Sequence, residues 1–194
     1  MYQKLEEIKE KCLKCEKCSL CKTRTNLVFS DGIPNSKMVL IGEAPGANED
    51  LEGKPFVGRS GKLLDQIFAS VNLYRDKDFY ICNTIKCRPP NNRKPLISEK
   101  EACREYLNAQ LNILQPKIII LCGSTAVESF LDTKLPISKI RGQWFNGINN
   151  SKMMPIFHPS YLLRNPSKEK FSPKWYMWQD VQEIKKSYEL IIFD

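Results

Sequence analysis

Four short apolar runs mark the chain, and segments with helical spacing separate them. The runs are Met38–Ile41, Phe79–Asn83, Ile118–Cys122 and Met153–Phe157. Each has the length of a buried strand. The helical patterns between and after them cover Gly61–Val71, Ser98–Leu114 and Ser124–Leu131, and a last helix opens at Ser172-Pro173. Strands that alternate with helices predict a parallel α/β sheet in a single domain spanning residues 1–194.

The unusual residues of the chain follow these expected strands. The motif GEAPG begins at Gly42 after the first strand, Asn83 ends the second, Gly123 follows the third and His158 follows the fourth. The carboxyl ends of parallel strands meet at one edge of a sheet, where open α/β proteins bind their ligands. The pattern therefore predicts an active site at this edge.

Composition narrows the class of partner. The chain has 30 Lys and Arg against 22 Asp and Glu, a net charge of +8, and 42% of its residues are hydrophobic. A basic chain favours polyanionic partners, with nucleic acid first among them. No apolar stretch is long enough to span a membrane, and the charged N-terminus resembles no secretory signal. We therefore expect a soluble cytoplasmic protein with no membrane partner.

Eight cysteines require an explanation in a reducing compartment, where disulfides are rare. They are Cys12, Cys15, Cys18, Cys21, Cys82, Cys87, Cys103 and Cys122. One interpretation is that they are buried structural cysteines. The other is a four-cysteine site, in which Cys15 and Cys18 supply two ligands from one turn and Cys87 and Cys103 supply two more. Zinc is chemically possible there, whereas the single histidine excludes sites that need two.

Two nucleotide-binding motifs fail on their spacing. GRSGK resembles the end of a P-loop, but Phe56 occupies the position of the first glycine and Leu63 follows Lys62. GEAPGANED lacks the GxGxxG spacing.

The segment HPSYLLR allows two interpretations. Its Leu162, Leu163 and Arg164 form either an ordinary helix or an apolar wedge with a phosphate anchor, as in proteins that open a base stack.

Four motifs occur in an order that resembles one family. GEAPGANED, GKPFVGRSGKLLD, NTIKCRPPNNRKPL and HPSYLLRNP together resemble the family 4 uracil-DNA glycosylases, the iron–sulfur branch of their superfamily. The resemblance implies a three-layer αβα sandwich around a central four-stranded parallel sheet. It also implies base excision repair, in which the enzyme flips uracil out of DNA and hydrolyses its N-glycosidic bond, leaving an abasic site.

The resemblance also implies a [4Fe–4S] cluster. The family pattern CxxCxLxxxRT aligns on Cys15, Cys18, Leu20, Arg24 and Thr25. This register selects Cys15 and Cys18 over Cys12 and Cys21 as ligands. KCRPP places the third ligand at Cys87, and the helix residue Cys103 is the fourth. Cys12, Cys21, Cys82 and Cys122 are then expected to be free.

The same resemblance assigns roles in the uracil pocket. Phe56 is the stacking platform, and the amide of Asn83 matches uracil O4 and N3–H. Main-chain groups of Gly42, Glu43 and Ala44 line the pocket near O2, where His158 stabilises the departing uracil anion. Family 1 relatives carry an aspartate where Ala44 stands, so Glu43 or Glu49 is a candidate to assist the water. Gly46 replaces their thymine-excluding aromatic residue, which leaves Glu49 as a candidate for that role.

We expect a monomer that binds uracil-containing DNA, single- or double-stranded. The expected DNA contacts are Ser60, Lys62, Arg88, Leu162, Leu163 and Arg164, and the basic surface also includes Arg59, Arg93 and Lys94. A DNA-crosslinking relative is a weak alternative, because such a relative carries a second histidine that this chain lacks. The other alternative is a non-catalytic DNA-binding or polymerase-associated module. That reading predicts the loss of Phe56, Asn83 or His158, and all three are present.

Overall fold

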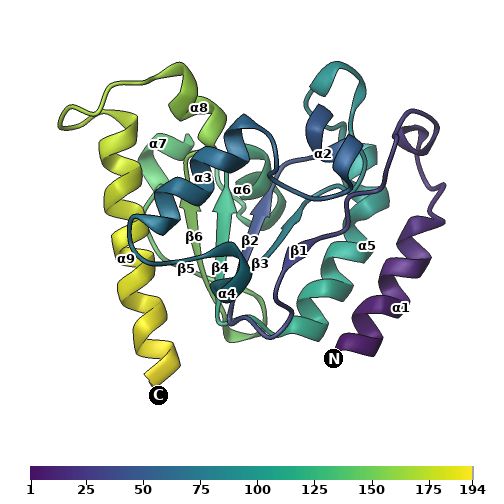
Figure 1. Ribbon diagram of the computed structural model, residues 1–194, viewed down its shortest axis with the longest axis horizontal. Coiled ribbons are helices and arrows are strands. Elements are labelled where there is room, and N and C mark those ends of the chain that lie inside the picture. The colour runs from purple at the N-terminus through teal and green to yellow at the C-terminus, as the bar shows by residue number, and fades with distance from the viewer. Residues whose placement is uncertain (194) are drawn as a thin grey trace.

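The computed structural model describes residues 1–193 and contains a six-stranded mixed sheet (Figure 1). The strands are β1 Asp31–Gly32, β2 Met38–Gly42, β3 Phe79–Asn83, β4 Ile118–Cys122, β5 Phe145–Asn146 and β6 Lys152–Ile156. Their order is β1-β3-β2-β4-β6-β5. The four central strands pair in parallel, as the sequence predicts.

The two edge strands were not predicted. Strands β1 and β5 are two residues long and pair antiparallel with β3 and β6. A two-residue strand carries no alternation of apolar and polar positions, so sequence periodicity cannot detect it. The central strands match the apolar runs to within one residue at their ends.

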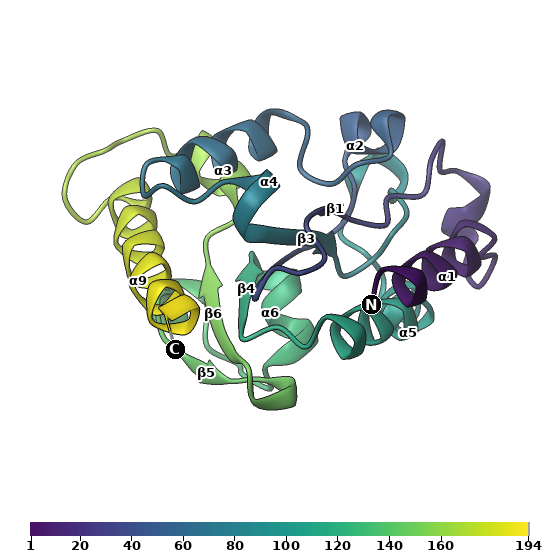
Figure 2. The same cartoon turned by 60° about the horizontal axis from the view of Figure 1, so that its bottom comes forward.

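Helices cover both faces of the sheet and make three layers (Figure 2). The helices are α1 Tyr2–Leu13, α2 Ala47–Glu52, α3 Arg59–Ala69, α4 Arg75–Asp78, α5 Ile97–Leu114, α6 Ser124–Phe130, α7 Ile137–Ile140, α8 Pro159–Arg164 and α9 Pro173–Phe193. Short 3-10 turns occupy Ser19–Lys22, Pro90–Asn92 and Ile148–Asn150. No helix among residues 1–193 is long and apolar enough to cross a membrane.

Alternate residues of each central strand enter two separate cores. Leu40 of β2 packs on the side of α3, α8 and α9, whereas Ile41 packs on the side of α1, α5 and α6. This alternation is the expected consequence of the two-residue period of a strand. A third, smaller core includes Cys12, Cys87 and Tyr106 beside the N-terminal helix.

The start of α9 confirms the predicted cap. The main-chain N–H of Trp175 donates to the Ser172 hydroxyl at 3.3 Å, and Pro173 is the first helical residue. A serine at this position satisfies a main-chain donor that the helix itself leaves unpaired. Helix α1, in contrast, is unpredicted.

Candidate active site

Gly42, Phe56 and Asn83 meet at the carboxyl ends of β2 and β3. A Cβ atom on Gly42 would lie 2.5 Å from Asn83 Oδ1 and 2.5 Å from Phe56 Cζ. No side chain fits at such distances, so glycine is required for the aromatic ring and the amide to approach one another. Asn83 is only 2% exposed and Phe56 only 7%. The structure thus brings together three of the residues predicted to bind uracil.

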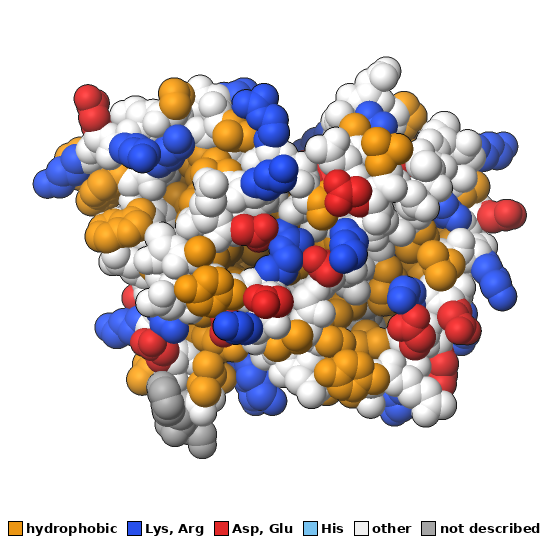
Figure 3. All heavy atoms as spheres, viewed as in Figure 1, with side chains coloured by type: hydrophobic (Ala, Val, Ile, Leu, Met, Phe, Trp, Pro, Cys, Tyr) orange, Lys and Arg blue, Asp and Glu red, His pale blue; other side chains and the backbone are white. Residues whose placement is uncertain are grey.

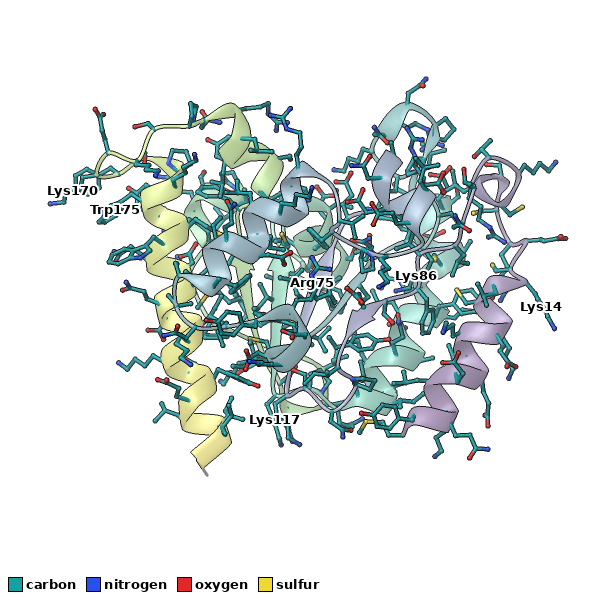
Figure 4. The ribbon with its side chains drawn as sticks, in the orientation of Figure 1. Lys14, Arg75, Lys86, Lys117, Lys170 and Trp175 are labelled. Atoms are coloured by element: carbon teal, nitrogen blue, oxygen red, sulfur yellow. The ribbon has the colours of Figure 1, made fainter. Side chains whose placement is uncertain are left out.

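The backbone of Phe56 is held in an unusual conformation by Arg75. Phe56 has φ of 55°, a region that bulky residues rarely adopt. The Arg75 guanidinium donates to the carbonyl oxygens of Pro55 at 2.8 Å and Phe56 at 2.6 Å. Arg75 also pairs with Asp31 and Asp65, each at 3.1 Å. It lies at the centre of the molecule in Figure 4, and sequence reasoning missed it.

His158 lies at the N-cap of α8, opposite Phe56. The two ring centroids are 5.9 Å apart. The main-chain N–H of Ser160 donates to His158 Nδ1 at 3.2 Å, so Nδ1 is the acceptor and the neutral ring carries its proton on Nε2. Burial lowers the pKa of His158 to about 4; the charge of Arg164 adds to this effect and Glu49 opposes it. The imidazole is therefore a neutral hydrogen-bond donor at physiological pH.

A cavity of about 460 Å³ opens beside His158. Its lining residues are Glu43, Ala44, Gly123, Ser124, Ile137, Ser138, Phe157, His158, Ser160, Tyr161 and Arg164. The Thr125 hydroxyl donates to the carboxylate of Glu43. The hydroxyl of Thr84 donates to the Glu43 carbonyl oxygen at 2.6 Å. Both ends of Glu43 are thus fixed at the wall of the cavity.

Glu49 joins two loops of the site. Its carboxylate accepts hydrogen bonds from the main-chain N–H groups of Gly46 at 3.1 Å, Val57 at 3.0 Å and Gly58 at 2.8 Å. These bonds connect the loop after β2 to the loop that carries Phe56. They also satisfy free donors at the start of α2 and before α3. Glu49 therefore has a clear structural role, which the sequence did not reveal.

The predicted DNA contacts divide into exposed and buried residues. Ser60 and Lys62 lie in the first turn of α3, and Arg164 ends α8. Leu163 is 37% exposed, whereas Leu162 is fully buried in the core against α3 and α9. The helical period points neighbouring side chains in different directions. This corrects the expectation that both leucines face DNA.

The loop after β3 carries the other predicted basic residues, and two of them have acidic partners. Arg93 donates two hydrogen bonds to the buried carboxylate of Glu99, at 2.8 and 2.6 Å, and Lys94 pairs with Glu128 at 2.8 Å. Arg88 donates to Asn92 at 2.8 Å. Arg93 thus stabilises the start of α5, which leaves Arg88 as the basic residue here without an acidic partner among residues 1–193.

Six cysteines surround one pocket, which we call the cysteine region: Cys12, Cys15, Cys18, Cys21, Cys87 and Cys103. Five of them belong to the third core, and Cys21 does not. Cys82 and Cys122 lie elsewhere, buried in β3 and β4. Within residues 1–193 no three His, Cys, Asp or Glu side chains are close enough to hold a single metal ion. The pocket brings together all four predicted ligands but does not separate them from Cys12 or Cys21.

Two cations border the cysteine region. Arg24 donates to Cys87 Sγ at 3.2 Å and to the Cys15 carbonyl oxygen at 3.1 Å. Lys86 is fully buried, and its ammonium donates to the Asn83 carbonyl oxygen at 3.0 Å. Burial raises the pKa of Cys103 to about 11, although the Lys86 ammonium and main-chain N–H act in the opposite direction. Lys86 has no carboxylate partner among residues 1–193.

Comparisons with known proteins agree with this geometry. The family model described as the uracil DNA glycosylase superfamily matches residues 29–182. A type-4 uracil-DNA glycosylase of Thermotoga maritima is 45% identical over 85% of this chain and 86% of its own length. One of Sulfurisphaera tokodaii is 42% identical over 97% and 85%. A DNA polymerase of Bacillus phage SP01 is 30% identical over 72% of this chain but only 15% of its own length. The chain therefore belongs to the uracil DNA glycosylase superfamily and, within it, to the type-4 family.

Proposed function

We propose that this protein is a DNA repair glycosylase that hydrolyses the N-glycosidic bond of uracil in DNA. The observation that carries the proposal is the meeting of Gly42, Phe56, Asn83 and His158 at one edge of the sheet. A base can enter such a site only after it has rotated out of the stack. The product is an abasic site, and no second cleavage is proposed.

Asn83 and Phe56 recognise the base. The Asn83 amide offers one acceptor and two donors. It thus matches uracil N3–H and O4 and opposes the reversed pattern of cytosine. Phe56 offers a flat apolar surface for stacking, and Gly42 leaves space beside both. A site built to hydrogen-bond its substrate rejects analogues that leave its polar groups unpaired.

His158 and Glu43 carry the chemistry. As the glycosidic bond breaks, negative charge develops on uracil and positive charge on the sugar. A neutral His158 Nε2–H directed at uracil O2 stabilises the departing anion, and the Ser160 amide keeps the ring in this tautomer. Glu43, fixed by Thr125 and Thr84, orients the water that attacks the sugar. Main-chain groups of Gly42 and Ala44 complete the pocket.

The cysteine region fits a [4Fe–4S] cluster held by Cys15, Cys18, Cys87 and Cys103. Cysteine thiolates are the usual ligands of such clusters. A ligated cluster is anionic, and the buried ammonium of Lys86 and the guanidinium of Arg24 provide the opposite charge. When bound, the cluster connects the N-terminal segment, the loop after β3 and α5. This position suits a structural role.

DNA lies across the carboxyl edge of the sheet in this proposal. Ser60, Lys62, Arg88 and Arg164 contact phosphates, and Leu163 is the exposed apolar residue that replaces the flipped base. Blue side chains along the upper rim of Figure 3 mark the basic part of this edge. The protein acts as a monomer on DNA in the cytoplasm.

A uracil-release assay tests the proposal. Oligonucleotides with one uracil, single-stranded or paired with guanine, should yield free uracil and an alkali-sensitive site, whereas thymine in the same position should not. The match to a phage DNA polymerase supports a second candidate, a non-catalytic module associated with a polymerase. Binding to uracil-containing DNA without release of uracil would favour that candidate and overturn the proposed activity.

A further inference from the structure

A groove of about 440 Å³ lies outside the site described above, between α3 and the start of α9. It is lined by Leu63, Gln66, Ile67, Ser70, Lys168, Lys174, Trp175 and Trp178. Together with Phe171 and Lys170, these residues form what we call the aromatic–lysine surface. Trp178 is 47% exposed and Phe171 is 62% exposed. Large aromatic side chains with such exposure are unusual on a protein surface.

Two aromatic rings of this surface, those of Phe171 and Trp175, pack against each other and against Tyr176. Phe171 and Trp175 have ring centroids 5.3 Å apart in an edge-to-face arrangement, and Trp175 and Tyr176 are 5.2 Å apart. Phe171 has φ of 67°, a strained conformation for a bulky residue. The rings thus offer ordered, solvent-facing surfaces before any ligand arrives.

The charge of this surface is positive. Residues 168–174 contain three lysines and a single acid, Glu169. Lys168, Lys170 and Lys174 form no ion pair with any residue from 1 to 193. The ammonium of Lys170 lies 5.1 Å from the centre of the Phe171 ring. Figure 4 places Lys170 and Trp175 together at the outer end of α9.

The surface follows the candidate active site along the chain. The chain runs from His158 through α8 to the segment 165–172 and then into α9. Figure 1 shows this segment on the same side of the molecule as α8. Along α3, Gln66 is seven residues beyond Arg59, which corresponds to about 10 Å of helix. A stacked strand rises about 3.4 Å per nucleotide, so roughly three nucleotides cover this distance.

We propose that the aromatic–lysine surface binds the unpaired DNA strand that flanks the flipped nucleotide. Alternating aromatic rings and lysines suit single-stranded DNA, because bases stack on the rings while the lysines face phosphates. Paired bases in a duplex are already stacked on each other and cannot reach the rings. An apolar protein segment would leave the three lysines without partners. The inference rests on the proposed function, since it extends the path of the DNA beyond the site of excision.

The test compares matched variants in equilibrium binding to a fluorescent single-stranded oligonucleotide with a central 2′-fluorinated deoxyuridine, which resists cleavage. Trp178→Ala should weaken binding at least about fivefold, the lower limit for losing one stacked base. Tyr2→Ala removes an aromatic residue that is 58% exposed at the other end of the molecule and should leave binding unchanged. Lys174→Ala should reduce the salt dependence of binding, whereas Lys117→Ala, at the opposite edge of the sheet, should not.

A second substrate separates stacking from charge. If the nucleotides that flank the uracil on one side are abasic, phosphates remain but bases are lost. The wild-type protein should lose affinity for this strand, and Trp178→Ala should lose no more. The inference is overturned if Trp178→Ala binds the normal strand within twofold of wild type. It is also overturned if sedimentation shows a dimer that Trp178→Ala dissociates, since a second copy would then cover the groove.

The inference and the proposed function fail in different ways. Uracil release at saturating substrate reports on the proposed function, and Trp178→Ala should leave this rate unchanged because Trp178 does not contact the pocket. Absence of release in the wild-type protein would overturn the proposed function. Normal release together with unchanged affinity of Trp178→Ala would overturn the inference alone.

Discussion

The proposed uracil pocket, formed around Gly42, Phe56, Asn83 and His158, and the cysteine region lie on either side of the end of β3. They are stabilised in different ways. In the pocket, protein groups hold one another: Arg75 holds the Phe56 main chain, Glu49 holds the loop before α3, and Ser160 holds His158. In the cysteine region, three segments distant in sequence face each other across sulfur atoms, beside the buried cation of Lys86. The pocket is therefore preorganised by the polypeptide, whereas the cysteine region suits the anionic cluster proposed above.

Lys86 is the direct connection between the two regions. Its ammonium donates to the carbonyl oxygen of Asn83, whose side-chain Oδ1 lies beside Gly42 in the candidate active site. Its main-chain N–H faces Cys103. A buried charge without a partner is strongly unfavourable. The cluster proposed above would therefore influence the pocket through the position of one main-chain carbonyl group, and not by contact with the substrate.

Replacement of His158 should slow excision in the pocket and leave the cysteine region unchanged. His158→Ala removes the donor at uracil O2, and loss of such a donor lowers rates by about 10²–10³, or about 3–4 kcal/mol. Single-turnover excision measures this effect. The visible absorbance of the cluster and the melting temperature serve as controls and should not change. A near-normal rate with unchanged DNA affinity would show that His158 is only a packed residue.

Replacement of Arg75 tests whether the pocket depends on its own hydrogen bonds. Arg75→Lys keeps the charge, but a lysine cannot donate in the planar geometry that serves Pro55, Phe56 and two aspartates. A displaced Phe56 should lower single-turnover excision by about 10–100-fold. The loss should appear in the rate at saturating DNA, with the cluster spectrum unchanged. A variant that melts earlier but excises at the wild-type rate would limit Arg75 to a stabilising role.

Two neighbouring cysteines test the cysteine region. Cys18→Ala should lose the cluster, while Cys21→Ala, in the same pocket and segment, should retain it. Metal binding contributes to folding stability, and a loss of about 2 kcal/mol would lower the melting temperature by about 4–8 °C in a domain of this size. Iron content and thermal melting measure both effects. Equal iron content in the two variants would contradict the assigned ligand set.

Strand ends were the most predictable part of the site. Gly42, Asn83 and His158 follow apolar runs, and parallel strands must bring their carboxyl ends together. The core position of Leu162 and the exposure of Leu163 depended on the exact rotation of α8, which a six-residue helix does not encode in its pattern. Strands β1 and β5 were too short to carry a period.

Arg75 and Glu49 show why the supporting residues escaped prediction. Arg75 acts on carbonyl groups 19 and 20 residues away, and Glu49 acts on amides eight and nine residues away. Main-chain groups carry no sequence signal, so such contacts become visible only in three dimensions. The cysteines show the opposite case. Their number was informative, but the choice among Cys12, Cys15, Cys18 and Cys21 required the family register.

The smallest expected effect is that of pH on the pocket. The pKa of His158 is lowered from its ordinary value of 6.5 to about 4, mainly by burial. The ring thus stays neutral above about pH 5, and single-turnover excision should be constant between pH 5.5 and 8 as far as this group is concerned. Below pH 6.5 the unfolded chain takes up the proton before the folded protein does, so the free energy of unfolding decreases between pH 6.5 and 4.

Replacement of Arg164 tests the cause of this pH dependence. Its charge lowers the pKa of His158 in addition to burial, so Arg164→Gln should move the acid limb of the excision profile to slightly higher pH. Between pH 5.5 and 8, single-turnover excision by this variant at saturating DNA should stay constant, because the ring of His158 is neutral in this range. Lys117→Ala, at the opposite edge of the sheet, should leave the acid limb in place. Single-turnover excision that rises as the pH is lowered from 8 to 5.5 in the wild-type protein, with circular dichroism unchanged, would contradict the neutral imidazole. In that case the positive imidazolium, and not the Nε2–H of a neutral ring, would face the uracil anion.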